Sequence, residues 1–332
     1  MTLQSDRYQE LARSARSAAA GSLGRRIVRA RWCYLFVLPS LTLSILFTFY
    51  PAVASWWISL LDWSGFSSVP VYTGLDNFRE VLGDEYFWGA FRRSFIFMFA
   101  AVPLQLGISL IVAIVLNDSK LRMAPFFRTM FFIPVVTTAA IVGIVMTFVL
   151  AQHNGPVNTA LMDLGLIDQP VDFLGNPDLA LPTVIGVFVW KWMGLTMIYW
   201  LAALQVVPAD VYEAARVDGA NRWQTHWRIT MPLIMPFAAI ITLIGAIGAL
   251  NVFPLIQTLT GGGPFFATEV MEIYIYRTAF GVEGATAPRL GYASAAGVWF
   301  GICVMLIALL QGLAARRVAA MRRDLQGGGA RS

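Results

Sequence analysis

Six long apolar stretches, separated by polar segments, dominate the pattern of the chain. A transmembrane helix needs roughly 20 mostly apolar residues to cross about 30 Å of hydrocarbon. Within each stretch the apolar residues are continuous rather than alternating, which favours helices over the strands of a membrane barrel. The predicted spans are residues 33–50, 94–116, 129–150, 182–206, 233–257 and 291–314. The pattern therefore predicts an all-α membrane protein with six transmembrane helices.

The amino-acid composition also indicates a membrane protein. Of the 332 residues, 58% are hydrophobic and 13% are charged, whereas soluble domains carry roughly 25% charged residues. The two cysteines, Cys33 and Cys303, lie in or beside apolar runs without disulfide or metal-ligand spacing, so we interpret them as small apolar residues. The two histidines, His153 and His226, form no metal-site or protease motif. A metal site and an intramembrane enzyme are both disfavoured.

The basic residues are distributed by loop. Segments 1–31, 117–128, 206–232 and 315–332 hold 18 of the 24 lysines and arginines, which predicts that these segments and both termini are cytoplasmic. The loop 151–181 has four aspartates and no lysine or arginine, as expected of an outward-facing loop. This distribution also explains the net charge of +5 without nucleic-acid binding. The pair Arg92 and Arg93 is a misfit, because it falls at the outer end of the second span.

These patterns divide the chain into a basic cytoplasmic tail (1–31), a membrane domain (32–314) and a second basic tail (315–332). The first tail and first apolar run, followed by Ala52, Val53 and Ala54, have the general form of a signal peptide. The preceding basic region and the apolar run are both longer than in signal peptides. We therefore expect the first span to be retained.

The polar segment 208–232, between the fourth and fifth spans, includes the stretch EAARVDGANRWQTHWRITMP. Pro208 suits a first helical turn, and Glu213 is expected near the helix N-terminus, where the dipole favours an acid. Gly219 is expected to end this helix in the left-handed conformation. The small side chains of Ala214 and Ala215 predict a flat patch that another protein can approach closely.

A second helix is expected to begin at Asn221, because Gln224 three residues later completes a capping box. We expect it to end near Thr230, before the proline that precedes the next span. Trp223, Trp227 and Thr230 recur at helical spacing and predict one shared face. Composition alone also allows a simple amphipathic connector on the lipid surface.

The residue types of this segment resemble the EAA motif of binding-protein-dependent ABC transporter permeases. The motif places a glycine four residues after EAA and ends on a proline; here Met231 stands where leucine is usual, and His226 where these relatives usually carry phenylalanine. The resemblance implies a type I importer permease fold in which this segment couples to an ATPase. It assigns that coupling to Glu213, Ala214, Ala215, Asp218, Gly219, Ala220, His226, Ile229 and Pro232.

Three further stretches are similar to the carbohydrate-uptake subfamily, and to its maltose-type first permease in particular: YTGLDNFREVL (72–82), FRTMFFIP (127–134) and LTGGGP (259–264). The resemblance implies a second permease as heterodimer partner, a cytoplasmic ABC ATPase dimer, an extracytoplasmic solute-binding protein, and a bacterial or archaeal cytoplasmic membrane whose lipid surrounds the spans. Glycerol phosphate carriers resemble the same subfamily, so the solute stays open between a sugar and a related polyol.

The chain lacks its own site for ATP. Its only lysines, Lys120 and Lys191, stand outside any GxxxxGK[ST] loop. The run Gly261 to Pro264 precedes no lysine, so it is expected to form a turn rather than a phosphate loop. The chain itself is therefore expected to bind no cofactor, and ATP with Mg²⁺ belongs to the partner ATPase.

Polar residues inside the spans are the candidates for a solute path. Lys191 lies about 13 Å past Pro182 at 1.5 Å per residue, near the middle of the fourth span, where a charge is by default a functional hypothesis. Its alternative is a purely structural pairing. Indole rings suit a sugar ring, and amides bond hydroxyls or join helices. The candidates are Lys191, Trp190, Trp192, Tyr199, Asn251, Gln257 and Gln105.

Two readings of the function therefore stand. The first is the permease of an ABC importer, working by alternating access. The second is an ion-coupled secondary transporter in which Lys191 takes part in coupling. The outer segment 268–280 is expected to form a short amphipathic helix at the membrane surface.

Overall fold

The computed structural model describes residues 31–66, 69–118, 121–281 and 287–328. The chain forms two units, 1–57 and 58–332. The first unit contains a helical run made of α3 (Arg31–Ser44), the π-turn η1 (Ile45–Phe49) and α4 (Tyr50–Ile58), whose last residue belongs to the second unit. This run includes the first predicted span. Of the predicted tail 1–31, all but its last residue lies outside the described residues.

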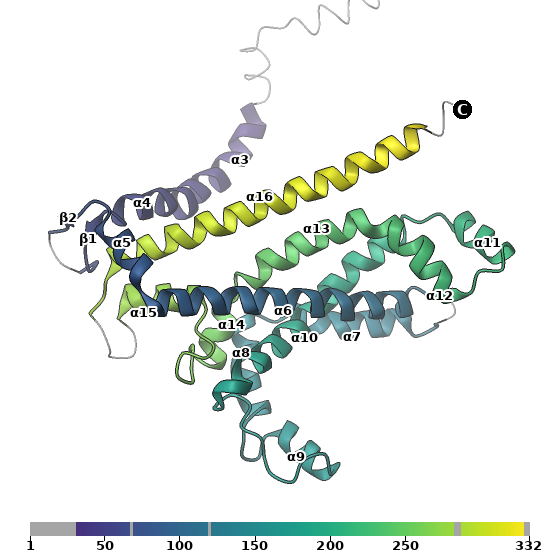
Figure 1. Ribbon diagram of the computed structural model, residues 1–332, viewed down its shortest axis with the longest axis horizontal. Helices are drawn as coiled ribbons and strands as arrows, with labels where there is room; N and C mark the ends of the chain where they lie inside the picture. Colours follow the sequence, from purple (N-terminus) through teal and green to yellow (C-terminus); the bar gives the residue numbers. More distant parts are fainter. Residues whose placement is uncertain (1–30, 67–68, 119–120, 282–286, 329–332) are drawn as a thin grey trace, which may run out of the picture. The chain divides into compact units, whose positions relative to one another are not determined.

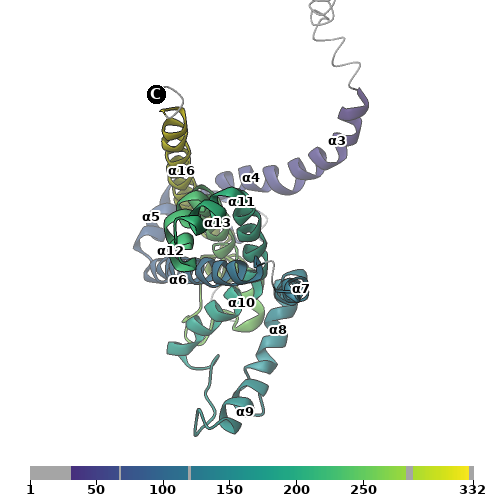
Figure 2. The ribbon, with the colours of Figure 1, turned by 90° about the vertical axis from the view of Figure 1, so that its right-hand side faces the viewer.

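The second unit is helical apart from one short antiparallel pair of strands. In chain order its elements are β1 (Leu61–Asp62), β2 (Val71–Tyr72), α5 (Asp76–Gly83), α6 (Glu85–Leu116), α7 (Ala124–Val136), α8 (Ala139–Val149), α9 (Pro156–Asp163), α10 (Pro177–Leu204), α11 (Ala209–Val217), α12 (Arg222–Thr225), η2 (His226–Thr230), α13 (Met231–Ala249), α14 (Phe253–Leu259), α15 (Met271–Phe280) and α16 (Leu290–Gly328). Helices α11 and α12 lie near one end of α6, and α5 and α15 lie near the other (Figure 1). Helices α8 and α9 extend to the side of α6 opposite α13 (Figure 2).

Helix α10 is the centre of this unit. In its most apolar window 61% of the residues are buried, against 33% for α6 and 17% for the helix at 223–249. It packs against α6, α7 and α13. One hydrophobic cluster joins its first half to α6, α8, α14, α15 and α16, and a second joins its last turns to α6, α7 and α13. The remaining spans present much of their apolar surface outward, as expected in lipid.

Within the described residues, five helices are long and apolar enough to cross a membrane, and a bent helix pair is a sixth candidate if its two halves count as one span. That pair is α7 and α8, which meet at an angle of 100°. The continuous helix expected over 129–150 is therefore wrong. Thr137 is extended, and the Thr138 hydroxyl accepts a hydrogen bond from the backbone N–H of Ile141 at 3.4 Å, which starts a new helix.

The fifth and sixth spans also differ from their predicted bounds. The helix expected at 233–257 begins at Arg222 and ends at Ala249, and α14 starts only at Phe253. The last helix continues past 314 to Gly328, so most of the tail predicted at 315–332 is helical. Residues 329–332 lie outside the described residues.

Candidate functional site

Three of the nine residues assigned to coupling, Glu213, Ala214 and Ala215, lie on the helix α11. Glu213, Ala214 and Asp218 are exposed, but Ala215 is buried, so the expected patch of two alanines is reduced to one. The acid in the first turn is Asp210, and Glu213 lies in the middle of the helix instead. The exposed side of the segment thus carries the acids Glu213 and Asp218 together with the apolar Val217.

Gly219 ends α11 as expected. Its φ of 76° is left-handed, and the backbone N–H of Ala220 donates to the carbonyl of Ala215 at 2.9 Å, which closes the last turn. No atom lies within 4 Å of the position that a Cβ would take at Gly219. Glycine is therefore needed here for the backbone conformation and not for space.

The capping box is also confirmed. The N–H of Gln224 donates to Asn221 Oδ1 at 2.8 Å, and the N–H of Asn221 donates to Gln224 Oε1 at 3.0 Å. The helix that begins here does not stop before Pro232, however, but runs through the π-turn η2 directly into α13. The proline ring clashes with the carbonyl four residues earlier, and the wider π-turn at Arg228 accommodates it. The expected surface helix is the first part of the fifth span.

The π-turn also changes which side chains share a face. Trp223 and Trp227 are exposed, and their ring centroids lie 5.4 Å apart, as predicted. Thr230 is fully buried, and its hydroxyl donates to the Tyr212 hydroxyl at 3.2 Å. Because a π-turn holds more residues per turn than an α-helix, the three-residue spacing no longer places Thr230 with the tryptophans. The Tyr212 contact ties α11 to the foot of the fifth span.

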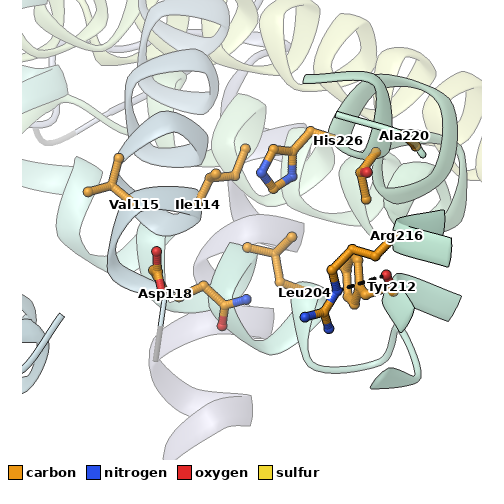
Figure 3. A pocket seen from close by; sticks show the side chains of 10 residues that line it. Ile114, Val115, Asp118, Leu204, Tyr212, Arg216, Ala220 and His226 are labelled. Carbon is orange, nitrogen blue, oxygen red and sulfur yellow. Dashed lines mark hydrogen bonds between the residues drawn. The ribbon is translucent and has the colours of Figure 1, made fainter. Parts of the chain in front are cut away.

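A cavity of about 610 Å³ lies behind α11 (Figure 3). The end of α6 forms one wall, and the coupling segment forms another. Among the described residues, the buried Nδ1 atom of His226 has no hydrogen-bond partner. The lining residues are Ile114, Val115, Asn117, Asp118, Leu204, Tyr212, Arg216, Ala220, Thr225 and His226. The cavity separates α11 from the end of α6.

A second cavity, of about 350 Å³, lies where the third and fifth spans are broken. It brings together Lys191, Trp192 and Asn251, three of the seven residues proposed for a solute path. Backbone from both breaks forms its walls. The lining residues are Val135, Val136, Thr137, Thr138, Ala139, Phe188, Lys191, Trp192, Asn251, Val252, Pro254 and Leu255.

Lys191 holds the end of α7. Its ammonium donates to the carbonyls of Thr137 at 2.7 Å and Pro134 at 3.2 Å, and lies 4.4 Å from the Trp192 ring centroid. The last carbonyls of a helix have no partner within the helix and carry partial negative charge. Lys191 is 1% exposed. It therefore has both expected features: it pairs with backbone carbonyls inside the fold, and it borders the cavity. Lys191 is the only ionisable residue among those lining it.

Glu272, a residue that the sequence reasoning missed, holds the start of α14. Its Oε2 atom accepts hydrogen bonds from the backbone N–H groups of Val252 at 2.8 Å and Phe253 at 2.6 Å. Burial raises the pKa of the Glu272 carboxyl, and these two hydrogen bonds act against that rise. The signal in the sequence is that Glu272 is the one acid of α15, a mostly apolar helix.

Two glycines allow the broken helices to pack closely. A Cβ at Gly194 would lie 1.9 Å from the carbonyl oxygen of Phe131, so α10 and α7 are in backbone contact there. A Cβ at Gly143 would lie 1.9 Å from Thr258 Oγ1, where α8 meets α14. Each half of the broken third span is thus fixed to a different partner helix.

The other solute-path candidates lie outside the lining of this cavity. Trp190 is 42% exposed. Gln105 is buried, and its amide donates to the Thr196 hydroxyl at 2.7 Å, joining α6 to α10. Tyr199 packs against the second hydrophobic cluster, and Gln257 is half-buried on α14. For Gln105 the structure favours the helix-joining alternative.

The segment 268–280 is helical only from Met271 and packs its apolar face against α16 and α6. It also accounts for the misfit of Arg93. Arg93 Nε donates to the carbonyl of Glu269 at 2.9 Å, and Arg277 Nε donates to Glu269 Oε1 at 2.7 Å. Burial raises the pKa of the Glu269 carboxyl, and the Arg277 hydrogen bond opposes that rise. Arg93 Nη2 also lies 3.7 Å from Glu269 Oε2, so Arg93 is a counterion of this carboxylate within the fold.

Comparison with known proteins gives consistent matches. Residues 86–320 match the family described as binding-protein-dependent transport system inner membrane component. The chain is 33% identical to the probable ABC transporter permease protein YurN of Bacillus subtilis over 279 residues, which covers 84% of this chain and 94% of YurN. It is 32% identical to the lactose transport system permease protein LacF of Rhizobium radiobacter over 285 residues, covering 85% and 93%.

The fold also matches a solved structure, described as a bacterial alginate ABC transporter in complex with alginate pentasaccharide-bound periplasmic protein. The TM-score is 0.76 at 27% sequence identity, and the match covers 90% of this chain and 98% of the other. The agreement extends over nearly the whole of the matched chain.

Proposed function

Because this chain belongs to the family of inner membrane components of binding-protein-dependent transport systems, we propose that it forms a translocation path for a carbohydrate in an ATP-driven importer. The chain is a transport subunit with a type I importer permease fold. A lactose permease and an alginate importer are among its relatives. Two further relatives are named for sugars and one for sn-glycerol-3-phosphate, so carbohydrates predominate among the named solutes.

One observation carries the proposal: the exposed helix α11 is rigidly joined to a membrane span. The left-handed Gly219 and the capping box fix the turn after α11, and the helix from Arg222 continues without a break to Ala249. A displacement of α11 by an ATPase would therefore move the N-terminal end of the fifth span, at α12 and η2. ATP and Mg²⁺ belong to that ATPase dimer.

The cavity at the two breaks is the proposed solute path. Lys191, Trp192 and Asn251 border it, and the ends of broken helices recur at the solute sites of membrane transporters. Alternating access would open this region to one side of the cytoplasmic membrane at a time. A second permease would supply the facing wall, and an extracytoplasmic binding protein would deliver the solute. The secondary-transporter alternative loses support, because two carbonyls already engage Lys191.

The test is ATP-driven uptake by the chain co-expressed with its partner permease, ATPase and binding protein. We expect Glu213→Ala with Gly219→Pro to insert normally and to stop uptake. Gly165→Pro is the matched control, because Gly165 is also left-handed, follows the end of α9 and has open space around it. Uptake by the double variant at the wild-type rate would refute the coupling assignment.

A panel of disaccharides, oligosaccharides and phosphorylated polyols tests the solute class in the same system. We expect uptake of at least one sugar. Uptake confined to phosphorylated polyols would overturn the carbohydrate proposal and leave the permease assignment intact.

A further inference from the structure

The first turn of α14 is capped by a side chain from another helix. The leading N–H groups of a helix lack partners within it, and the N-cap residue Val252 supplies no side-chain cap. Glu272, which lies 20 residues further along the chain, accepts from the N–H groups of Val252 and Phe253. The position of α14 therefore depends on where α15 holds this carboxylate.

Helix α15 is itself fixed to the unbroken helix α6. The N–H of Met271 donates to the Ser94 hydroxyl at 2.8 Å. The Tyr274 hydroxyl donates to the carboxylate of Asp84, the N-cap of α6. These bonds hold α15 without using α14, so Glu272 projects from a fixed support.

Helix α14 in turn forms a wall of the solute cavity. Val252, Pro254 and Leu255 line it. The same short helix packs on α8, where Gly143 faces Thr258. Because α8 provides another wall through Ala139, a shift of α14 changes the width of the cavity from two sides.

We propose that Glu272 is a positioning residue that holds α14 against α8 and thereby sets how far the solute cavity opens. The inference rests on the proposed solute path. Displacing α15, or removing its carboxylate, releases α14 and widens the cavity. The end of the molecule that bears α15 thus controls the cavity at the helix breaks.

The experiment measures the labelling rate of a cysteine in the cavity wall. Ala139→Cys is introduced after replacement of the native Cys33 and Cys303 by serine, and the full complex is treated with a hydrophilic methanethiosulfonate. Two hydrogen bonds to the Glu272 carboxylate hold the start of α14 in place, so Glu272→Ala is expected to raise the labelling rate at least tenfold.

Glu272→Gln separates positioning from general structure, because its amide oxygen still accepts both N–H groups; we expect labelling within about threefold of wild type. Glu80→Ala is the matched control, since it removes a carboxylate that binds Arg289 and does not touch α14. A second reporter, Ala203→Cys, lies buried at the far end of α10 and detects general loosening.

Unchanged labelling of Ala139→Cys in the Glu272→Ala protein overturns the proposal. An equal rise at Ala203→Cys also overturns it, because the effect would then be general unfolding. Labelling requires no solute, so its result is independent of the uptake assays. If the wild-type complex takes up no sugar, that result counts against the proposed function and not against the role of Glu272.

Discussion

The substitution Gly194→Ala tests whether backbone contact between α10 and α7 positions the broken third span. A Cβ at this residue would lie 1.9 Å from the carbonyl oxygen of Phe131 and 2.7 Å from its carbonyl carbon. Both atoms belong to the backbone, so no side-chain rotation relieves the clash. Carbon to oxygen contacts need about 3.3 Å, and α7 must therefore move away by about 1.4 Å.

That displacement also reaches Lys191, which lies one helical turn before Gly194. Its hydrogen bond to Pro134 is already 3.2 Å long, and a further 1.4 Å of separation would take it beyond hydrogen-bond distance. Overpacking costs about 1–3 kcal/mol, and a lost hydrogen bond to a charged group costs about 1.5 kcal/mol or more. We expect the free energy of unfolding to fall by roughly 3 kcal/mol.

Thermal unfolding of the purified complex, followed by tryptophan fluorescence, measures this loss. At about 2 °C per kcal/mol we expect Tm to fall by about 6 °C, together with solute uptake. Gly186→Ala is the control on the same helix, since Gly186 is exposed and has no atom within 4 Å of the added Cβ. Its Tm is expected to stay the same or to rise slightly, because alanine favours the helix. Equal Tm and uptake for the two variants would refute the packing argument.

Three further predictions use the same assays. Asn221→Ala removes the cap at the foot of the fifth span and should cost about 1 kcal/mol; an unchanged Tm and an unchanged coupling of ATPase activity to uptake would contradict this. Lys191→Met leaves two carbonyls of α7 without their donor, so we expect a lower Tm and a changed solute affinity, and an unaltered transport profile would leave only a packing role. The Arg289 hydrogen bond lowers the pKa of Glu80 below its ordinary 4.5, so its stabilisation is present above pH 4.5 and lost as pH falls through the lower folded value. The wild type should therefore lose more Tm on acidification than Glu80→Gln, and parallel pH curves would contradict the assignment.

The local signals in the coupling segment were readable because their partners are close in sequence. A left-handed glycine and a capping box depend on residues within four positions of one another, and both are present at Gly219 and Asn221. The continuation through Pro232 was not readable, because it depends on a π-turn that changes the helical register. The same change of register removed Thr230 from the face of the tryptophans.

Hydropathy located the spans but not the breaks within them. Residues 136–139 and 250–253 contain no charged residue, and Thr137, Thr138 and Asn251 are their only polar residues, so the average hydropathy across either break stays that of a single span. The positions of two prolines do mark the helix breaks. Pro254 occupies the first turn of α14, a position that favours proline because its missing N–H needs no partner there. Pro134 lies in the last turn of α7, near the point where the chain turns.

Two charged side chains at the helix ends, the buried Lys191 and the half-buried Glu272, explain why the breaks are tolerated. A helix interrupted inside a membrane exposes carbonyls at one end and N–H groups at the other, and the hydrocarbon cannot satisfy either. Here an ammonium from α10 meets the carbonyls of α7, and a carboxylate from α15 meets the N–H groups of α14. Each charge has the sign that its helix end requires. Lys191 at mid-span is therefore a sign of a broken neighbouring helix, and the cavity forms there because the break removes backbone that would otherwise fill the space.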